Sequence, residues 1–173
     1  ELGERLGEFG LKLHPEKTRL IEFGRFAAQN RKKRGDGKPE SFDFLGFTHR
    51  CGTTKKGKFK IDRKTAKKRL RAKITEVRKQ LMAHRHDGIH VLGKWLRAVI
   101  TGYMNYHAIH GNLGTMNTFR SEVIKAWFAA LRRRGQKARL TWEKFRPWVR
   151  KWIPSVRLKH PYPLERFYAI HPR

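Results

Sequence analysis

The stretch Phe42-Asp43-Phe44-Leu45-Gly46-Phe47 is a compact apolar segment that predicts a β-strand. A basic turn containing Gly57 follows it and leads to Phe59-Lys60-Ile61, so the sequence predicts two strands joined as a hairpin. A glycine among large apolar residues favours a bulge at Gly46, or a close approach there by a neighbouring backbone or a ligand. Taken alone, the pattern is also typical of an ordinary packed hairpin.

The segment before the hairpin is predicted to hold a short helix and a further strand. Apolar residues recur at helical spacing over residues 1–9, where they form one packed stripe, and Gly10 ends this helix. Residues 18–23 mix β-branched, charged and aromatic side chains, which favours a strand. Residues 28–40 have no period and many turn formers, so we expect an exposed, mobile loop.

The segment after the hairpin is predicted to be helical. A first helix begins at Arg63, with Asp62 as its N-cap, and further helices cover about residues 89–109 and 114–134. Matched apolar faces and short connections predict an antiparallel three-helix bundle. The three faces are Ala66, Leu70, Ile74, Val77 and Leu81; Leu92, Trp95, Leu96, Val99, Ile100, Tyr103 and Tyr106; and Met116, Phe119, Val123, Ile124, Trp127, Phe128 and Leu131.

Aromatic residues on such faces are more typical of a core than of a base-stacking platform. A role outside the core remains open for a cluster of polar and aromatic groups near Gly111. The cluster consists of Tyr103, Asn105, Tyr106 and His107.

The C-terminal part is predicted to be a helix followed by an irregular basic tail. Thr141 can cap a helix rich in tryptophan, which Pro147 is expected to kink or divide. The chain as a whole is therefore predicted to be an α+β protein. Its parts are a helix with antiparallel strands over residues 1–62, a helical bundle over 63–145 and a basic tail over 146–173.

The charge of the chain predicts a polyanionic partner. Lys and Arg number 42 against 14 Asp and Glu, which gives a formal net charge of +28. Residues 63–173 hold 27 of these basic and 5 of the acidic side chains, so they carry most of the excess. Nucleic acid is the leading candidate partner and an acidic membrane surface the weaker one. With no spanning segment or signal peptide in the sequence, a cytoplasmic protein is expected.

The spacing of the candidate residues does not support a catalytic or a metal site. His84, His86 and His90 lie close together but lack a nearby acidic cluster, and the single Cys51 excludes zinc sites built on paired cysteines. Cys51 is expected to be a small, half-buried residue. No evident two-metal pair is formed by the carboxylates at Glu16, Glu22, Asp43 and Asp62. His107, His110 and Asn112 match a His-Asn-His nuclease only superficially.

Several segments, taken in order, resemble a known family. They are Leu11-Lys12-Leu13 with Lys17-Thr18, Phe42 to Phe47, Trp95-Leu96, Gly102-Tyr103, Gly111-Asn112, Arg133 to Lys137, and Leu140-Thr141-Trp142. Together they resemble the end of the palm and the thumb, or maturase region, of group II intron reverse transcriptases. The resemblance implies that residues 1–62 are the C-terminal part of the palm and residues 63–145 the maturase-specific thumb.

The resemblance also implies what the chain lacks. The Tyr-Ala-Asp-Asp motif that holds the catalytic metal ions in this family occurs nowhere in the sequence. No catalytic residue, metal ligand or cofactor is therefore assigned to this chain, and Mg²⁺ is expected only for the full-length polymerase. Because Glu1 stands where an initiator Met would be, we expect the chain to begin partway through a longer protein. The missing N-terminal fingers and palm would be its partners.

Site residues follow from the same resemblance. Lys17 matches a palm lysine associated with the triphosphate, and the hairpin residues Phe44, Leu45, Gly46 and Phe47 match the support of the primer end. RNA phosphates would be contacted from the first thumb helix and from a second basic segment. The first set is Arg63, Lys64, Lys67, Lys68 and Arg71, and the second is Arg132, Arg133, Arg134, Lys137 and Arg139.

Three functional hypotheses remain open. The first is the RNA-binding portion of a mobile retroelement enzyme, whose partners are group II intron RNA and an RNA template with its DNA primer. The second is a stand-alone splicing cofactor that binds RNA and never polymerises. The third is a basic helical protein, ribosome-associated or DNA-compacting, whose charges form a solvated surface.

Overall fold

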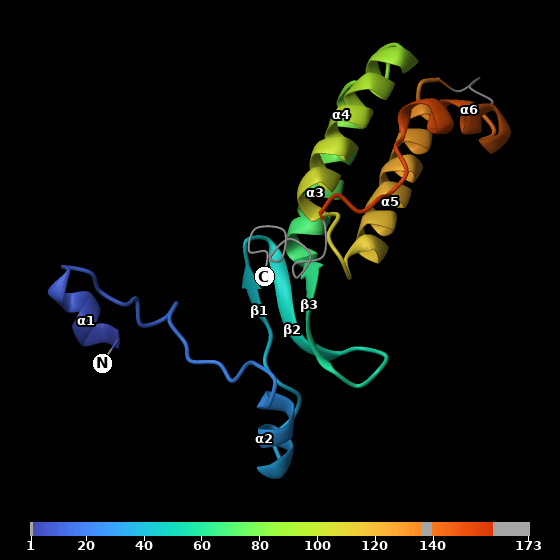
Figure 1. Cartoon of the computed structure of the whole chain (residues 1–173). Coiled ribbons are helices and arrows are strands. Elements are labelled where there is room, and N and C mark those ends of the chain that lie inside the picture. Colours follow the sequence, from blue (N-terminus) through green and yellow to red (C-terminus); the bar gives the residue numbers. More distant parts are fainter. Residues whose placement is uncertain (1, 136–139, 161–173) are drawn as a thin grey trace, which may run out of the picture. The chain divides into compact units, whose positions relative to one another are not determined.

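The computed structural model describes residues 2–135 and 140–160 (Figure 1). In these residues the fold is α+β, with six helices and one three-stranded antiparallel sheet of order β1-β2-β3. None of the described helices is both long and apolar enough to cross a membrane. The elements are α1 (Leu2–Glu8), α2 (Ala27–Lys33), β1 (Phe42–Phe44), β2 (Phe47–Thr53), β3 (Phe59–Thr65), α3 (Lys67–Ala83), α4 (Ile89–His107), α5 (Leu113–Arg132) and α6 (Trp142–Trp152).

The chain divides into two compact units. The first contains residues 2–42 and Arg50–Ile61, and the second contains Asp43–His49 and the described residues from Asp62 onward. The second unit holds the main hydrophobic core.

The apolar segment at residues 42–47 forms a strand, a tight turn and the start of a second strand. Leu45 and Gly46 have φ values of 47° and 81°, so the two residues make the turn between β1 and β2. Positive φ at both central positions is the geometry of a type I′ hairpin turn, which favours glycine. The bulge expected at Gly46 is therefore wrong. The predicted basic turn is confirmed, with Gly57 at a φ of 74° between β2 and β3.

The first unit differs most from the sequence predictions. Residues 18–23 form no strand, because no neighbouring strand pairs with them, and the segment expected as a loop begins with helix α2. Arg34, just after α2, pairs with Glu22 and Asp36, and Gly35 follows with a φ of 77°. These local ion pairs, and the glycine that ends the helix, explain the short helix α2. No apolar period in the sequence predicted it. The predicted N-terminal helix is present as α1, but it buries none of its residues.

Cys51 is half-buried, as expected. The backbone N–H of Gly24 donates a hydrogen bond to its sulfur at 3.4 Å. Next to Gly24, the ring of Phe23 meets the ring of Phe42 edge to face, with the two centroids 5.0 Å apart. These contacts supply part of the packing within the first unit.

The helical faces predicted for the second unit form its core. All three stripes contribute residues with little or no exposure, among them Leu81, Leu96 and Phe119. Helix α5 packs against α3 and α4, and Arg78 of α3 donates to Glu122 of α5 at 2.5 Å. The prediction that the aromatic stripes belong mainly to a core is confirmed.

Helix α3 begins later than predicted. Residues through Thr65 pair in β3, and the N–H of Ala66 donates to the carbonyl of Gly46 at 2.9 Å, which leaves Lys67 as the first helical residue. Asp62 is consequently a strand residue rather than an N-cap. Pairing with β2 outweighs the helical preference of these basic residues, because tertiary contacts commonly override intrinsic helix propensity.

Helix α6 runs without interruption through Pro147. Thr141 caps it as predicted, accepting a hydrogen bond from the N–H of Lys144 at 3.5 Å. The predicted division at Pro147 is wrong. The loss of one backbone donor is outweighed because Phe145 and Trp152, on either side, are buried in the core.

Candidate nucleic-acid interface

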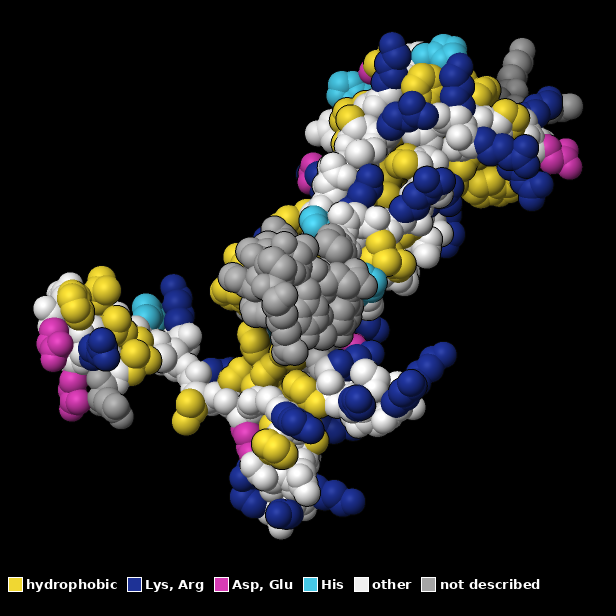
Figure 2. Space-filling model, viewed as in Figure 1, with side chains coloured by type: hydrophobic (Ala, Val, Ile, Leu, Met, Phe, Trp, Pro, Cys, Tyr) yellow, Lys and Arg dark blue, Asp and Glu magenta, His cyan; other side chains and the backbone are white. Residues whose placement is uncertain are grey.

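Lys and Arg side chains cover much of the surface formed by helices α3 to α6. In the part of Figure 2 that these helices occupy, blue side chains are spread over the face in view and magenta ones are few. Residues 63–173 contain 27 basic and 5 acidic side chains, so most of this charge has no acidic neighbour to neutralise it. Such a surface attracts polyanions from a distance and does so less at high salt.

An open groove of about 440 Å³ in the second unit combines this charge with aromatic rings. Arg69 and Lys73, one turn apart on α3, line one side of it. Tyr103, Tyr106 and His107 of α4 line the other side. The groove is completed by Gly46, Ala98, Val99 and Gly102. Cations beside accessible aromatic rings are the combination that proteins use to bind single-stranded nucleic acid.

The hairpin turn is fixed to α4 through Tyr106. The Tyr106 hydroxyl donates to the carbonyl of Leu45 at 2.7 Å, and its ring stacks on Phe47 with centroids 5.6 Å apart. About half of Tyr106 remains exposed, at 51 %. The turn itself exposes Phe44 and Leu45, at 58 % and 66 %, whereas Phe47 is buried. The hairpin therefore presents apolar side chains beside the groove, while its turn is held by α4.

A buried hydrogen-bond network supports the floor of the groove. Asn112 lies at the start of α5 and is fully buried. Its side-chain oxygen accepts from the N–H of Thr65 at 3.0 Å, and its nitrogen donates to the Thr65 hydroxyl and to the carbonyl of His107, each at 2.8 Å. The hydroxyl of Thr65 in turn lies 3.3 Å from His107 Nδ1. One amide thus joins the ends of β3 and α4 to the start of α5.

The network and its surroundings favour a neutral imidazole at His107. Burial lowers the pKa of His107, and the charge of Arg69 lowers it further. The Thr65 hydroxyl already accepts from Asn112, so its own proton is available for His107 Nδ1. Burial also raises the pKa of Tyr103, whose ring lies 4.3 Å from that of His107, to about 12. Both side chains are consequently uncharged near neutral pH.

A stability titration should reveal this buried histidine. Because its pKa is lower in the folded state than the ordinary value of 6.5, the unfolded chain binds one more proton between the two values. The free energy of unfolding is therefore expected to be highest above about pH 6.5 and to decrease as the pH falls toward the folded-state pKa.

The measurement is urea denaturation of the chain and of its His107→Gln variant at a series of pH values. The variant should lose this part of the pH dependence, whereas the exposed-site control His86→Gln should keep it. An unchanged profile in His107→Gln would assign the dependence to other groups.

The basic residues predicted for RNA contact lie on several elements. Lys67, Lys68 and Arg71 are exposed on α3, but Arg63 and Lys64 lie on β3, so the placement of all five on one helix is wrong. Arg132 ends α5, and Arg133 and Arg134 follow it. Lys137 and Arg139 lie outside the described residues. Lys17 is exposed in a turn of the first unit.

Two groove residues, Arg69 and Lys73, were not among the predicted contacts. A signal for them exists in the sequence, since their i, i+4 spacing places them on one side of α3, next to the apolar stripe that begins at Ala66. Their neighbours Tyr103, Tyr106 and His107 belong to the cluster for which the sequence left a role outside the core open. The pairing of the two helices was needed to bring these groups together.

No metal site is evident in the described part of the chain. Residues 2–135 and 140–160 contain no group of three or more His, Cys, Asp or Glu side chains placed to hold a metal ion.

Comparisons of the chain with protein-family models, with curated proteins and with solved structures find no match. The resemblance to group II intron reverse transcriptases therefore remains a hypothesis, based on the order of the sequence motifs.

Proposed function

We propose that this chain is the RNA-binding C-terminal portion of a group II intron reverse transcriptase and maturase. In this proposal β1 to β3 are the end of the palm, and helices α3 to α5 are the thumb bundle. The chain binds intron RNA to assist splicing, and within the full-length protein it also holds template and primer. The observation that carries the proposal is the groove in which Arg69 and Lys73 face the aromatic side chains of α4.

The groove has the chemistry that RNA binding requires. The cationic side chains of α3 can neutralise backbone phosphates, and Tyr106 offers a half-exposed ring to a base. Lys73 also contacts Glu76 at 2.9 Å, a surface ion pair of small energetic value that a phosphate can replace. The neutral His107 adds no positive charge of its own, so Arg69 and Lys73 are the cations among the residues that line the groove.

Binding to two classes of RNA tests the proposal. The purified chain should bind a folded group II intron RNA more tightly than an unrelated RNA of the same length in a filter-binding assay at several salt concentrations. Both affinities should fall with salt, because phosphate contacts release counterions. Equal affinities with equal salt slopes would contradict the maturase proposal and favour a generally basic protein.

Charge removal in the groove provides the matching variants. The double variant Arg69→Gln/Lys73→Gln should weaken intron RNA binding by about ten-fold or more and reduce the salt slope by roughly two phosphate contacts. Lys79→Gln/Lys94→Gln removes the same charge from two exposed positions that do not line the groove and should have a smaller effect. Equal losses in both double variants would mean that total charge, not the groove, determines binding.

A further inference from the structure

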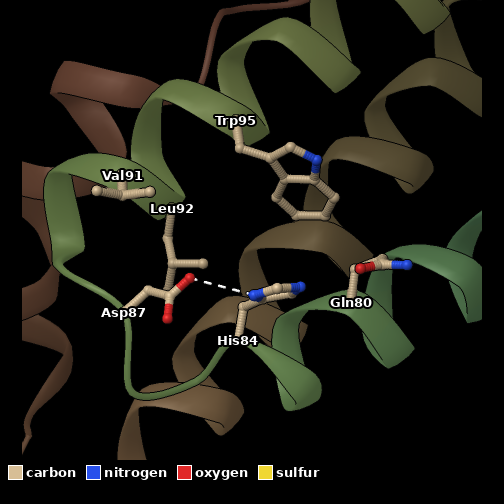
Figure 3. A pocket seen from close by; sticks show the side chains of 6 residues that line it. All are labelled: Gln80, His84, Asp87, Val91, Leu92 and Trp95. Carbon is tan, nitrogen blue, oxygen red and sulfur yellow. Dashed lines mark hydrogen bonds and ion pairs between the residues drawn. The ribbon is translucent and has the colours of Figure 1, made fainter.

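A second hollow lies where the C-terminal end of α3 meets the first turns of α4. It encloses about 220 Å³, and Figure 3 shows the six side chains that line it. Val91, Leu92 and Trp95 come from α4, whereas Gln80 and His84 come from α3 and Asp87 from the connecting turn. This hollow shares no lining residue with the groove.

The walls of this hollow are apolar and aromatic. Leu92 is buried at its base and the indole of Trp95 is half-buried, so both belong to the rigid body of α4. In Figure 3 the Trp95 ring stands above Gln80 on one side of the space. A fixed indole is a large, flat surface on which a planar ring can stack.

The remaining lining residues carry polar groups that include both hydrogen-bond donors and acceptors. His84 Nδ1 lies 3.2 Å from Asp87 Oδ2, which orients the ring and leaves its second nitrogen for another partner (Figure 3). The exposed carboxamide of Gln80 offers both a donor and an acceptor. Paired donors and acceptors of this kind match the edges of nucleobases.

The size and the surrounding charge limit the kind of occupant. Pockets for whole drug-sized ligands are usually larger, at about 300 Å³ or more, so this space suits a single planar ring system. Arg134 donates to the carbonyl of Asp87 at 2.6 Å, which places a guanidinium beside the turn where a backbone phosphate would follow the base. An aliphatic side chain of a partner protein would use the apolar wall and leave these polar groups without partners.

We propose that this hollow is a nucleobase pocket, which takes one unstacked base of single-stranded RNA between Trp95 and the Gln80 and His84 side chains. The proposal rests on the proposed RNA-binding function and deepens it. The groove contacts phosphates through Arg69 and Lys73 and offers the Tyr106 ring to one base, whereas the pocket takes a second base. The chain therefore distinguishes a strand with exposed bases from one without them.

The test compares two oligonucleotides that differ only in their bases. One is a single-stranded RNA of about twelve nucleotides, and the other has the same backbone and length but abasic sites throughout. The full chain should bind the first more tightly. Trp95→Leu should reduce its affinity for the RNA about ten-fold while leaving the abasic affinity and the salt slope unchanged.

Two further variants make the result specific to the pocket. Gln80→Ala removes an exposed polar group without touching the core and should weaken RNA binding several-fold with the fold intact. Trp142→Leu removes another tryptophan, 46 % exposed on α6 and outside the pocket, and should change neither affinity. Circular dichroism confirms that each variant is folded.

The possible failures are distinguishable. If the unmodified chain binds neither oligonucleotide, both the proposed function and the pocket are overturned. If it binds both equally, or if Trp95→Leu and Gln80→Ala lower the two affinities by the same factor, the nucleobase pocket alone is overturned. Equal loss of RNA binding in Trp142→Leu would also overturn the assignment to this pocket.

Discussion

Replacing Gly93 with alanine is expected to destabilise the second unit by about 1–3 kcal/mol, although alanine is the better helix former. Gly93 lies on α4 where α6 packs against it, and a Cβ at this position would come within 2.4 Å of Cγ of Trp152. The indole is buried and its neighbours fill the core, so it has little room to move away. The substitution should therefore separate α6 from α4.

Gly102 provides the matched control on the same helix. A Cβ built there has no neighbour within 4 Å, so Gly102→Ala should stabilise the helix by about 1 kcal/mol or less. Urea denaturation followed by the helical circular dichroism signal compares the two variants. Two outcomes would contradict the packing argument: equal effects at both positions, or an unchanged cost of Gly93→Ala when Trp152 is also replaced by alanine.

The helical part of the fold could be predicted well because its signal is local. The apolar residues of α3, α4 and α5 recur every three or four positions, and those faces are the ones that the structure buries. The basic turn at Gly57 also follows from a short segment, whereas the β1–β2 turn was missed, since residues 42–47 were expected to form one strand. Periodicity and turn chemistry are properties of the sequence itself.

The errors arise where distant residues decide the outcome. Residues 59–65 continue as a strand because β2 is available to pair with them, and this moved Arg63 and Lys64 off the predicted helix. Helix α2 was missed for another reason, since it is short and Ala27 is its buried residue. Neither the longer strand β3 nor the short helix α2 produces a periodic apolar pattern in the sequence.

The candidate site was partly predictable, because some of its features are local in the sequence and others depend on distant contacts. The abundance of basic residues after Asp62 could be counted, and the cluster around Tyr103 was visible as a break in an otherwise apolar face. The groove itself requires α3 and α4 to bring Arg69 and Lys73 opposite the aromatic residues. A charged surface can thus be predicted from composition, but the site on that surface depends on helix pairing.

The role of Asn112 could not be predicted from its neighbours in the sequence. An asparagine just before a helix is typical of an N-cap, yet its side chain makes no capping hydrogen bond to α5. It instead bonds to Thr65, which lies 47 positions earlier, and to the carbonyl of His107. The residue therefore serves as the junction between β3, α4 and α5.

Replacing Asn112 with alanine is accordingly expected to cost about 2–4 kcal/mol of stability. The change leaves the buried N–H of Thr65 without its partner, at a position with no exposed surface. It also removes one of two donors from the carbonyl of His107, which keeps the N–H of Ile109 at 2.9 Å. Asn112→Asp should be destabilising as well, because a carboxylate can accept from Thr65 but cannot donate to either oxygen, and it brings a charge into the core.

The control is Asn117→Ala, which makes the same substitution at an exposed position of α5 and should change stability by about half a kcal/mol or less. Chemical denaturation of the three variants measures the difference. A double variant with Thr65→Val distinguishes the network from general packing, since removing both partners should cost less than the sum of the single losses. Strict additivity would mean that the bond between the Asn112 amide and the Thr65 hydroxyl contributes nothing, since Thr65→Val leaves the backbone bonds of Asn112 in place. Because the same network sets the position of His107 in the groove, any coupled loss should extend to RNA binding measured under conditions where the variant remains folded.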